Sequence, residues 1–283
     1  MAKSTKIAKR ETSEVATTMP KHMREYQGAG LEQISTSDLE VPRIKLLQAL
    51  SPELQEHNDA KPSHFWHSVA EVDLGRSLRI VPVYVDQSFI LWRPRKAGGG
   101  ILARAADGIH WSPAEGEFET TLEDGKTKVK WKLAKTVAAS GLAEWGSMDP
   151  SDPNSPPAAT RMYNIVAVMP DQEGALSPAV ITLQRSAIAV ARKFLGKLKI
   201  SQAPSFGCYY QMEAVKDQNN QNQEFFNYKF TMAGFVEDET EFAKYRETYD
   251  VFKKMGLRIK DIEGLQTEDP TDPTAGKKEN KKF

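Results

Sequence analysis

Hydrophobic and polar residues alternate in short runs through much of the chain, and this pattern is typical of β-strands. The clearest run is Lys128–Leu133, in which Val129, Trp131 and Leu133 alternate with lysines. It predicts a strand with one apolar face, including Trp131, on the core and one basic face outside. Similar runs predict further strands at about residues 79–85, 89–93, 101–104, 163–169, 179–183, 209–215 and 225–236.

Helical spacing of apolar residues is found in a few segments. It predicts helices at about residues 42–50, 185–198 and 239–255, the last followed by Gly256 as a stop signal. The prolines of residues 147–160 argue against a helix or a central strand there. Many short strands with few helices predict a mainly β (α+β) fold, an OB-like antiparallel β barrel or sandwich with two or three appended helices.

Composition changes along the chain and predicts its domain organisation. Residues 1–36 are polar and rich in Lys, Ser and Thr, so we expect a flexible basic N-terminal arm. A single β-rich domain is predicted for residues 37–256, and a flexible C-terminal tail for residues 257–283. No apolar run approaches the roughly 20 residues of a membrane span. The one cysteine, Cys208, is expected to be buried, and a single thiol fits a reducing cytoplasm.

The charges balance overall but are segregated along the chain. There are 38 Lys and Arg residues and 38 Asp and Glu residues. Residues 126–135 contain five lysines and no acid, and residues 176–212 contain five basic residues and no acid. Residues 76–104 hold six basic residues and one acid, whereas residues 236–272 are rich in acids. Such basic blocks are either solvated faces or binding surfaces for an anionic partner.

The sequence shows no arrangement of residues that is typical of catalysis. The glycines at 98–100 are not followed by the Gly-Lys-Ser/Thr of a phosphate-binding loop. His64 and His67 lack a matched third ligand, so they are interpreted as packing residues rather than a metal site. No Gly-x-Ser-x-Gly nucleophile motif is present. We therefore expect a protein that is not an enzyme and has no catalytic residues, no cofactor and no metal.

Basic and aromatic residues occur together in the predicted strands, and this combination is typical of proteins that bind single-stranded nucleic acid. Cations neutralise phosphates and flat side chains stack on bases. Trp92 and Tyr210 are the preferred stacking candidates. The full set of candidate nucleic-acid-binding residues is Arg79, Trp92, Arg93, Arg95, Lys96, Arg104, Trp111, Lys128, Lys130, Lys132, Arg192, Lys193, Tyr210 and Tyr228.

Several blocks of the chain resemble a known family. They are VPRIKLLQALSPE from Val41, SFILWRPRKAGGGILAR from Ser88, SGLAEWGSMDPSDPNSPPAAT from Ser140, and the FFNYKF strand. In layout the chain resembles the single-stranded DNA-binding proteins of tailed bacteriophages, which have an OB-type barrel and assist replication and recombination. The resemblance implies single-stranded DNA as partner, replication or recombination proteins bound through the C-terminal tail, and a homo-oligomer. Unlike the acidic tails of many such proteins, the residues before Phe283 are basic.

The balanced net charge leaves a second hypothesis open. In a phage structural or host-takeover protein, the basic and acidic blocks would pair between subunits of an assembly. The position of the exposed aromatic residues distinguishes the two hypotheses. They should lie beside the lysines in a nucleic-acid-binding protein, and with the acidic C-terminal helix in a separate apolar patch in an assembly protein.

Overall fold

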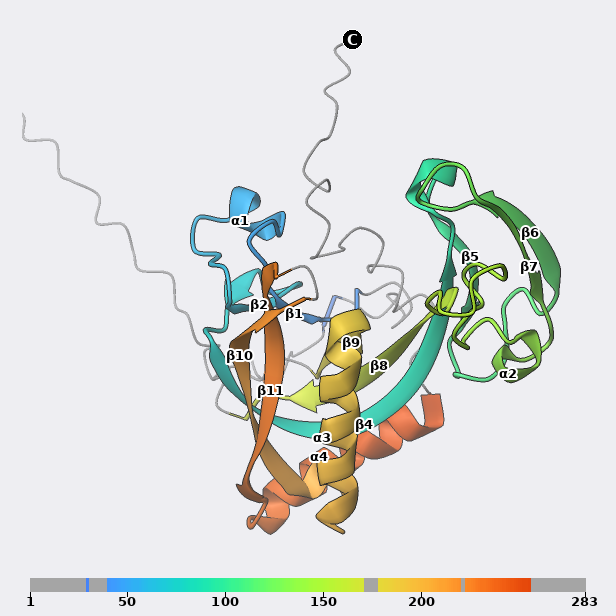
Figure 1. Cartoon of the computed structure of the whole chain (residues 1–283). Helices are drawn as coiled ribbons and strands as arrows, with labels where there is room; N and C mark the ends of the chain where they lie inside the picture. Colours follow the sequence, from blue (N-terminus) through green and yellow to red (C-terminus); the bar gives the residue numbers. More distant parts are fainter. Residues whose placement is uncertain (1–28, 31–39, 171–177, 220–221, 256–283) are drawn as a thin grey trace, which may run out of the picture. The chain divides into compact units, whose positions relative to one another are not determined.

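The computed structural model describes residues 29–30, 40–170, 178–219 and 222–255 (Figure 1). The chain divides into two units, residues 1–39 and residues 40–283, and every helix and strand described below lies in the second. Of the predicted basic arm, residues 1–36, only Ala29 and Gly30 are described, and the predicted tail lies outside the described residues.

The described residues are mainly β, with antiparallel sheets and few helices. The helices are α1 (Glu53–Glu56), α2 (Val137–Ser140), α3 (Ile188–Ile200) and α4 (Glu239–Met255), with short 3-10 helices η2 (Arg95–Ala97), η3 (Arg185–Ala187) and η4 (Ser205–Gly207). The strands are β1 (Ile44–Leu46), β2 (Phe65–His67), β3 (Val72–Asp73), β4 (Ser77–Trp92), β5 (Ile101–Ala105), β6 (Gly116–Thr121), β7 (Lys128–Leu133), β8 (Ala159–Val168), β9 (Ala179–Gln184), β10 (Cys208–Gln218) and β11 (Glu224–Phe235).

The long strand β4 organises the main sheet, whose strand order is β11-β10-β4-β8-β9. Its first residues, Ser77 to Ile80, pair with β10, and its later residues, Val81 to Leu91, pair with β8. Its last four residues also pair with β5. Figure 1 shows β4 as a long curved ribbon that runs past all three partners. Strand β4 therefore connects the part of the sheet that contains β10 and β11 with the part that contains β8 and β9.

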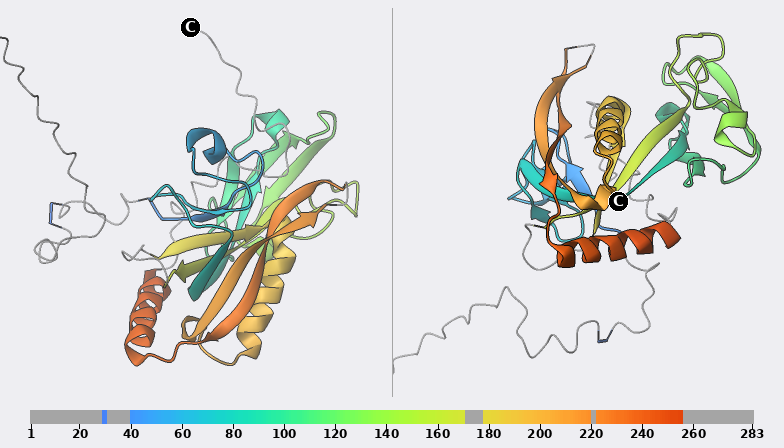
Figure 2. Two further views of the ribbon diagram at one scale, coloured as in Figure 1. Left: turned by 90° about the vertical axis from the view of Figure 1, so that its left-hand side faces the viewer. Right: turned by 90° about the horizontal axis from the view of Figure 1, so that it is seen from below.

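The two faces of the main sheet are covered by different helices (Figures 1 and 2). On one face, Phe194 of α3 stacks on Phe230 of β11, with ring centroids 4.4 Å apart, and meets the ring edge of Tyr210 at 5.0 Å. On the other face, Tyr245 of α4 packs with Val81 and the neighbouring valines of β4, β8 and β9. Each helix buries its apolar stripe, as expected for amphipathic helices on a sheet.

A smaller core lies beside β5, where residues 106–158, which follow this strand, leave the main sheet. Here β6 and β7 form a two-stranded hairpin, and the loop after α2 packs against it. Trp131 is buried in this core, as the alternation in β7 predicts, and its Nε1 donates to the backbone oxygen of Ser147 at 3.1 Å. Val129 and Leu133 share its inward face. The prediction for this strand is confirmed in both bounds and orientation.

The main sheet is open, and the described strands form no closed barrel. The predicted mainly β class is confirmed, but the OB-like barrel is not observed. Both outer strands of the sheet are covered by chain from the β1 region instead of pairing with each other. Val180 of β9 donates its backbone N–H to Pro42 at 2.8 Å. At β11, the side chain of Gln48 bonds both the N–H and the C=O of Phe226.

Two of the three predicted helices are confirmed, because α3 and α4 begin and end within three residues of the predicted bounds. The helix predicted at residues 42–50 is wrong. Ile44 and Leu46 are buried on either side of Lys45 and form β1, in which Ile44 pairs with His67 and Leu46 with Phe65. The same apolar residues satisfy a spacing of two as well as a helical spacing, and pairing with β2 selects the strand.

Candidate nucleic-acid interface

The lysines of β7 lie opposite acidic residues of β6. The register places Lys130 opposite Glu119 and Lys132 opposite Glu117, and Lys130 Nζ lies 2.6 Å from Glu117 Oε2. The hydrogen bond from Lys130 lowers the pKa of Glu117, and the same bond raises the pKa of Lys130. Lys128 faces Thr121. The predicted row of ammonium groups is exposed, but neighbouring carboxylates offset much of its charge.

The turn between β4 and β5 brings together three of the predicted cations, Arg93, Arg95 and Lys96, all of them exposed. Acidic residues lie here too. Glu123 Oε1 accepts the backbone N–H of Arg95 at 2.6 Å. Hydrogen bonds from Thr127 and the backbone, with a smaller contribution from Lys96, lower the pKa of Asp124 to about 2. This cluster is therefore of mixed charge.

Two of the predicted stacking residues are buried, and the prediction that they stack on bases is corrected here. Tyr210 is 0% exposed and Trp111 is 3% exposed. Tyr210 shares the inward face of β10 with Cys208 and Met212, and Trp111 packs in the smaller core. Burial raises the pKa of the Tyr210 hydroxyl. The aromatic content of these strands belongs to the core, where it contributes to packing rather than to base stacking.

The other two predicted aromatic residues are partly buried. Trp92 packs with Ile90, Ile101 and Met162. Tyr228 lies against Phe230, with ring centroids 6.3 Å apart, and burial raises its pKa to about 12.

Arg79 and Arg104 are also engaged within the fold. The guanidinium of Arg79 lies over the ring of Tyr209, 5.0 Å from its centroid. Arg104 is half-buried in β5, which exchanges two backbone hydrogen bonds with Ser112 at 2.7 and 3.0 Å. A cation held on an aromatic face has less freedom to turn towards a phosphate.

The cations of α3 differ from those of the strands. Ala191 and Phe194 are buried against the sheet, and this turns Arg192, Lys193 and Lys199 outwards. These three side chains are exposed and form no ion pair with any residue that the structure describes. No acidic residue occurs between positions 178 and 212. Their positive charge is not offset by acidic neighbours in sequence or by salt bridges.

Apolar side chains are exposed next to the end of α3. Ile200 is 82% exposed, Phe235 is 55% exposed and Met232 is 36% exposed. Met232 pairs with Tyr210 and Phe235 pairs with Cys208, both inward-facing residues of β10. Because directly paired residues share a face, Met232 and Phe235 lie on the face of the sheet that α3 covers.

Further contacts bring this apolar group to the cations of α3. The Nζ atom of Lys197 donates to the backbone oxygen of Phe230, two residues before Met232. Burial raises the pKa of the thiol of Cys208, the residue that pairs with Phe235, and the nearby side chain of Ser201, which follows Ile200, partly opposes this shift. We call this region the α3–β11 surface; it consists of Arg192, Lys193, Lys199, Ile200, Met232 and Phe235.

Sequence reasoning identified Arg192 and Lys193 but missed the three apolar residues. Strict alternation along β11 would place residues 232 and 235 on opposite faces. The ladder with β10 shifts register here, and the shift turns both side chains to one face. Gly234, at φ 140°, was the available signal, because an isolated glycine in a strand often marks a bulge.

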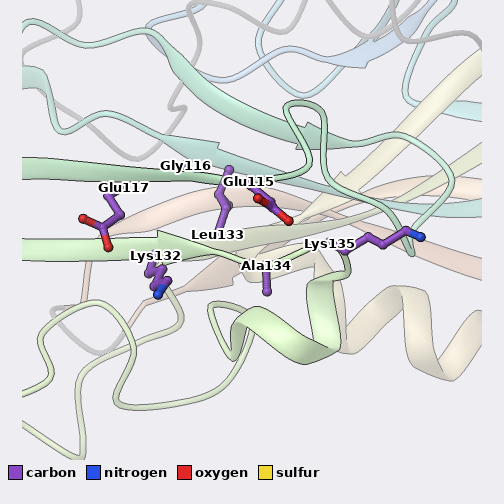
Figure 3. Close-up of a pocket in the computed structure, with 7 residues that line it drawn as sticks. All are labelled: Glu115, Gly116, Glu117, Lys132, Leu133, Ala134 and Lys135. Carbon is purple, nitrogen blue, oxygen red and sulfur yellow. The ribbon is translucent and has the colours of Figure 1, made fainter.

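Figure 3 shows a surface pocket at the start of β6 and the end of β7, with a volume of about 460 Å³. Its lining carries two carboxylates and two ammonium groups around Leu133. The lining residues are Glu115, Gly116, Glu117, Lys132, Leu133, Ala134 and Lys135. With equal numbers of both charges, it offers little attraction to a polyanion.

Within the described part of the chain, no three or more His, Cys, Asp and Glu side chains are placed to hold a metal ion. None of the described helices combines the length and the apolar composition that crossing a membrane requires.

Comparison with known proteins gives one family. No curated protein and no solved structure matches the chain. The model of the Pam3 phage gp34-like protein family matches residues 10–258, which include every described helix and strand. The chain therefore belongs to the Pam3 phage gp34-like protein family, a family of bacteriophage proteins.

Proposed function

We propose that this phage protein is a non-enzymatic single-stranded DNA-binding protein that acts in DNA replication or recombination, and that it binds DNA through the α3–β11 surface. The observation that supports the proposal is that α3 carries cations without an ion pair to any described residue and ends near exposed apolar side chains. Arg192, Lys193 and Lys199 have no ion pair with a described residue, and Phe235 is 55% exposed near the end of the same helix. Single-strand binding requires this combination of cations and flat or apolar surface.

The electrostatic part of the proposal follows from the state of the cations. A strand lysine such as Lys130 must give up or share its carboxylate partner to bind a phosphate, and this offsets the gain. The exposed cations of α3 have no such partner to lose. Each phosphate that they neutralise releases condensed counterions, which is the main driving force of sequence-independent binding.

The apolar part of the proposal explains why a single strand is preferred. In a duplex both faces of each base are covered by stacked neighbours. An unpaired base can instead place one face on Phe235 or against the flexible side chain of Met232. Stacking of this kind contributes about 1–3 kcal/mol per base. We therefore expect weaker binding to duplex DNA, which uses only the cations.

Fluorescence anisotropy of a labelled oligo-dT of about 30 nucleotides tests the proposal, with a duplex of equal length beside it. Three cation–phosphate contacts predict a log-log salt slope of about −2, at roughly −0.7 per contact on a single strand. The double variant Arg192→Glu with Lys193→Glu should bind at least about tenfold more weakly at low salt.

The matched control is Lys130→Glu, which reverses the charge of an exposed lysine on β7 instead of on α3. It should leave affinity within about twofold, because the lost charge was already paired with Glu117. Absence of oligo-dT binding at low salt contradicts the proposed function. A larger loss from the β7 variant than from the α3 variant would move the site to the strands.

An assembly function is the second candidate, because a different exposed aromatic residue lies on an acidic segment. Trp145 is 72% exposed and follows Glu144 in the loop after α2. This is the arrangement expected of a protein-binding surface, with an aromatic anchor away from the cations.

A further inference from the structure

The segment that carries Trp145 has the opposite charge from the α3–β11 surface. Residues 136–160 contain Glu144, Asp149 and Asp152 and no basic residue. Glu144 and Asp152 are exposed, and Asp149 is partly exposed. None of the three forms an ion pair with a described residue. An anionic nucleic acid is repelled by such a segment, whereas a basic protein surface is attracted to it.

The loop around Trp145 is held in place by many hydrogen bonds. The hydroxyl of Ser147 donates to the backbone oxygens of Leu142 and Glu144 at 2.9 and 2.6 Å, and it accepts the N–H of Ala158 at 3.0 Å. Gly146 N–H donates to the oxygen of Ser155 at 2.7 Å. Leu142, 5% exposed, anchors the loop in the smaller core. The indole is thus presented on an ordered support, so little conformational entropy is lost when it binds.

We propose that this loop binds the α3–β11 surface of a second copy of the chain. The charges are complementary, since residues 136–160 carry acids and no bases, whereas Arg192, Lys193 and Lys199 of α3 form no ion pair with a described residue. The apolar side chains of the two surfaces match as well. In the proposed contact, the exposed indole of Trp145 packs against the exposed side chains of Ile200, Met232 and Phe235 of the second copy. An aromatic anchor on an apolar patch, surrounded by opposite charges, is the usual composition of a protein–protein interface.

This contact is heterologous, because it joins two different surfaces. Each chain keeps one unused surface after pairing, so the contact adds further copies head to tail and gives assemblies that grow with concentration. The proposed contact uses side chains, and at Phe226 the backbone of the outer strand β11 is already bonded by Gln48. Association through side chains of opposite charge should weaken as salt rises.

The same α3–β11 surface would then serve both a second copy and DNA. Self-association does not depend on the proposed function, but competition between the two partners does. If DNA binds there, a short oligonucleotide should separate the assemblies into single chains, because phosphates and acidic side chains compete for the same cations.

Sedimentation velocity of the full chain tests the proposal over a wide concentration range at about 50 mM and about 500 mM salt. At low salt the mean mass should rise with concentration above the 31.6 kDa of one chain, and at high salt it should return to that value. The control Leu50→Ala removes another exposed apolar side chain, 54% exposed, and should assemble as the unmodified chain does. A single-chain mass at every concentration and low salt overturns the proposal.

Complementation between two variants gives a stricter test. Trp145→Ala removes the anchor of one surface, and Arg192→Glu with Lys193→Glu reverses the other, so each variant alone should remain a single chain. Mixed in equal amounts, they should form dimers and nothing larger, because one intact loop can meet one intact α3–β11 surface. A mixture that stays at the mass of one chain, or assembly by Trp145→Ala alone, overturns the proposal.

The two proposals can fail separately. At protein concentrations too low for self-association, Trp145→Ala should bind oligo-dT with the affinity of the unmodified chain, because the indole is not on the DNA surface. Self-association with no DNA binding contradicts only the proposed function. DNA binding by a chain that never self-associates contradicts only the assembly proposal.

Discussion

Asn164 of β8 donates its side-chain amide to Oδ1 of Asp86 on β4, at 3.0 Å across the paired strands. The same amide reaches Ser88 Oγ at 2.9 Å, and Asn164 Oδ1 accepts from Thr182 at 3.1 Å. Burial raises the pKa of Asp86 to about 6, and the hydrogen bond from Asn164 only partly opposes it. A carboxylate thus sits on the main sheet in an environment that favours its neutral form.

Replacing this carboxylate should stabilise the protein at neutral pH. The pKa of Asp86 in the folded chain is above its ordinary value of 3.8, so its contribution to stability is complete below about pH 3.8 and is lost as pH rises through about 6. Two pKa units correspond to about 3 kcal/mol. Asp86→Asn should therefore raise the free energy of unfolding by up to about 3 kcal/mol at pH 7.5.

Chemical denaturation at pH 7.5 and pH 5 measures this difference. The advantage of Asp86→Asn over the unmodified chain should shrink at pH 5, where Asp86 is largely protonated. An advantage that is equal at both pH values would show that the charge of Asp86 is not its cause.

Phe194 holds α3 on the sheet. Its ring is 1% exposed and lies between Phe230 and Tyr210. Phe194→Ala leaves a cavity at this contact and should lower the free energy of unfolding by about 3–5 kcal/mol. Arg192→Ala, on the exposed side of the same helix, should change it by less than about 0.5 kcal/mol. Urea denaturation measures the free energy of unfolding of both variants. An equal decrease in the two would mean that this ring does not anchor the helix.

Gln48 bonds the backbone of the outer strand β11. Its amide donates to Phe226 O at 2.9 Å, and its Oε1 accepts Phe226 N–H at 2.8 Å. Gln48→Ala leaves both backbone groups without this partner and should cost about 1–3 kcal/mol. Hydrogen exchange at the Phe226 amide should become faster, while Gln55→Ala, an exposed residue of α1, should leave it unchanged. Unchanged exchange in Gln48→Ala would show that another group protects this edge.

Phe235→Ala should weaken oligo-dT binding without changing the salt slope. Loss of one stacked base costs about 1–3 kcal/mol, a fall in affinity of about fivefold to 150-fold. The slope reports phosphate contacts and depends on the cations of α3, which remain. Phe225→Ala, at the other end of β11, is the matched control. A loss confined to Phe225→Ala would place the bases at the hairpin end instead.

The sequence predicted those elements whose hydrophobic pattern fits only one type of secondary structure. Strand β7 alternates without interruption, and α4 combines one apolar face with a stop signal, so both were predicted closely. Residues 42–50 carry apolar side chains that fit either period, and only pairing with β2 decides between them. The open sheet was not predicted, because which chain covers Val180 and Phe226 depends on contacts between distant residues.

The candidate site was predicted less well than the fold. Cations can be counted in a sequence, but whether a carboxylate offsets them depends on register, as Lys130 and Glu117 show. Exposure of aromatic residues depends on which side of the chain faces the core. Tyr210 and Trp111 face the core and are therefore not part of the candidate site. The register shift before Phe235 reverses the face of that side chain, and the alternation rule cannot anticipate it.

Leu91 at the end of β4 pairs with Ala159 at the start of β8. After β5 the chain leaves the main sheet, and it returns at Ala159, so residues 106–158 form one long connection outside that sheet. Insertions or deletions in that connection need not disturb the register of the main sheet. The loop that carries Trp145 can accordingly change in length or sequence without altering the strand pairing that supports α3 and β11.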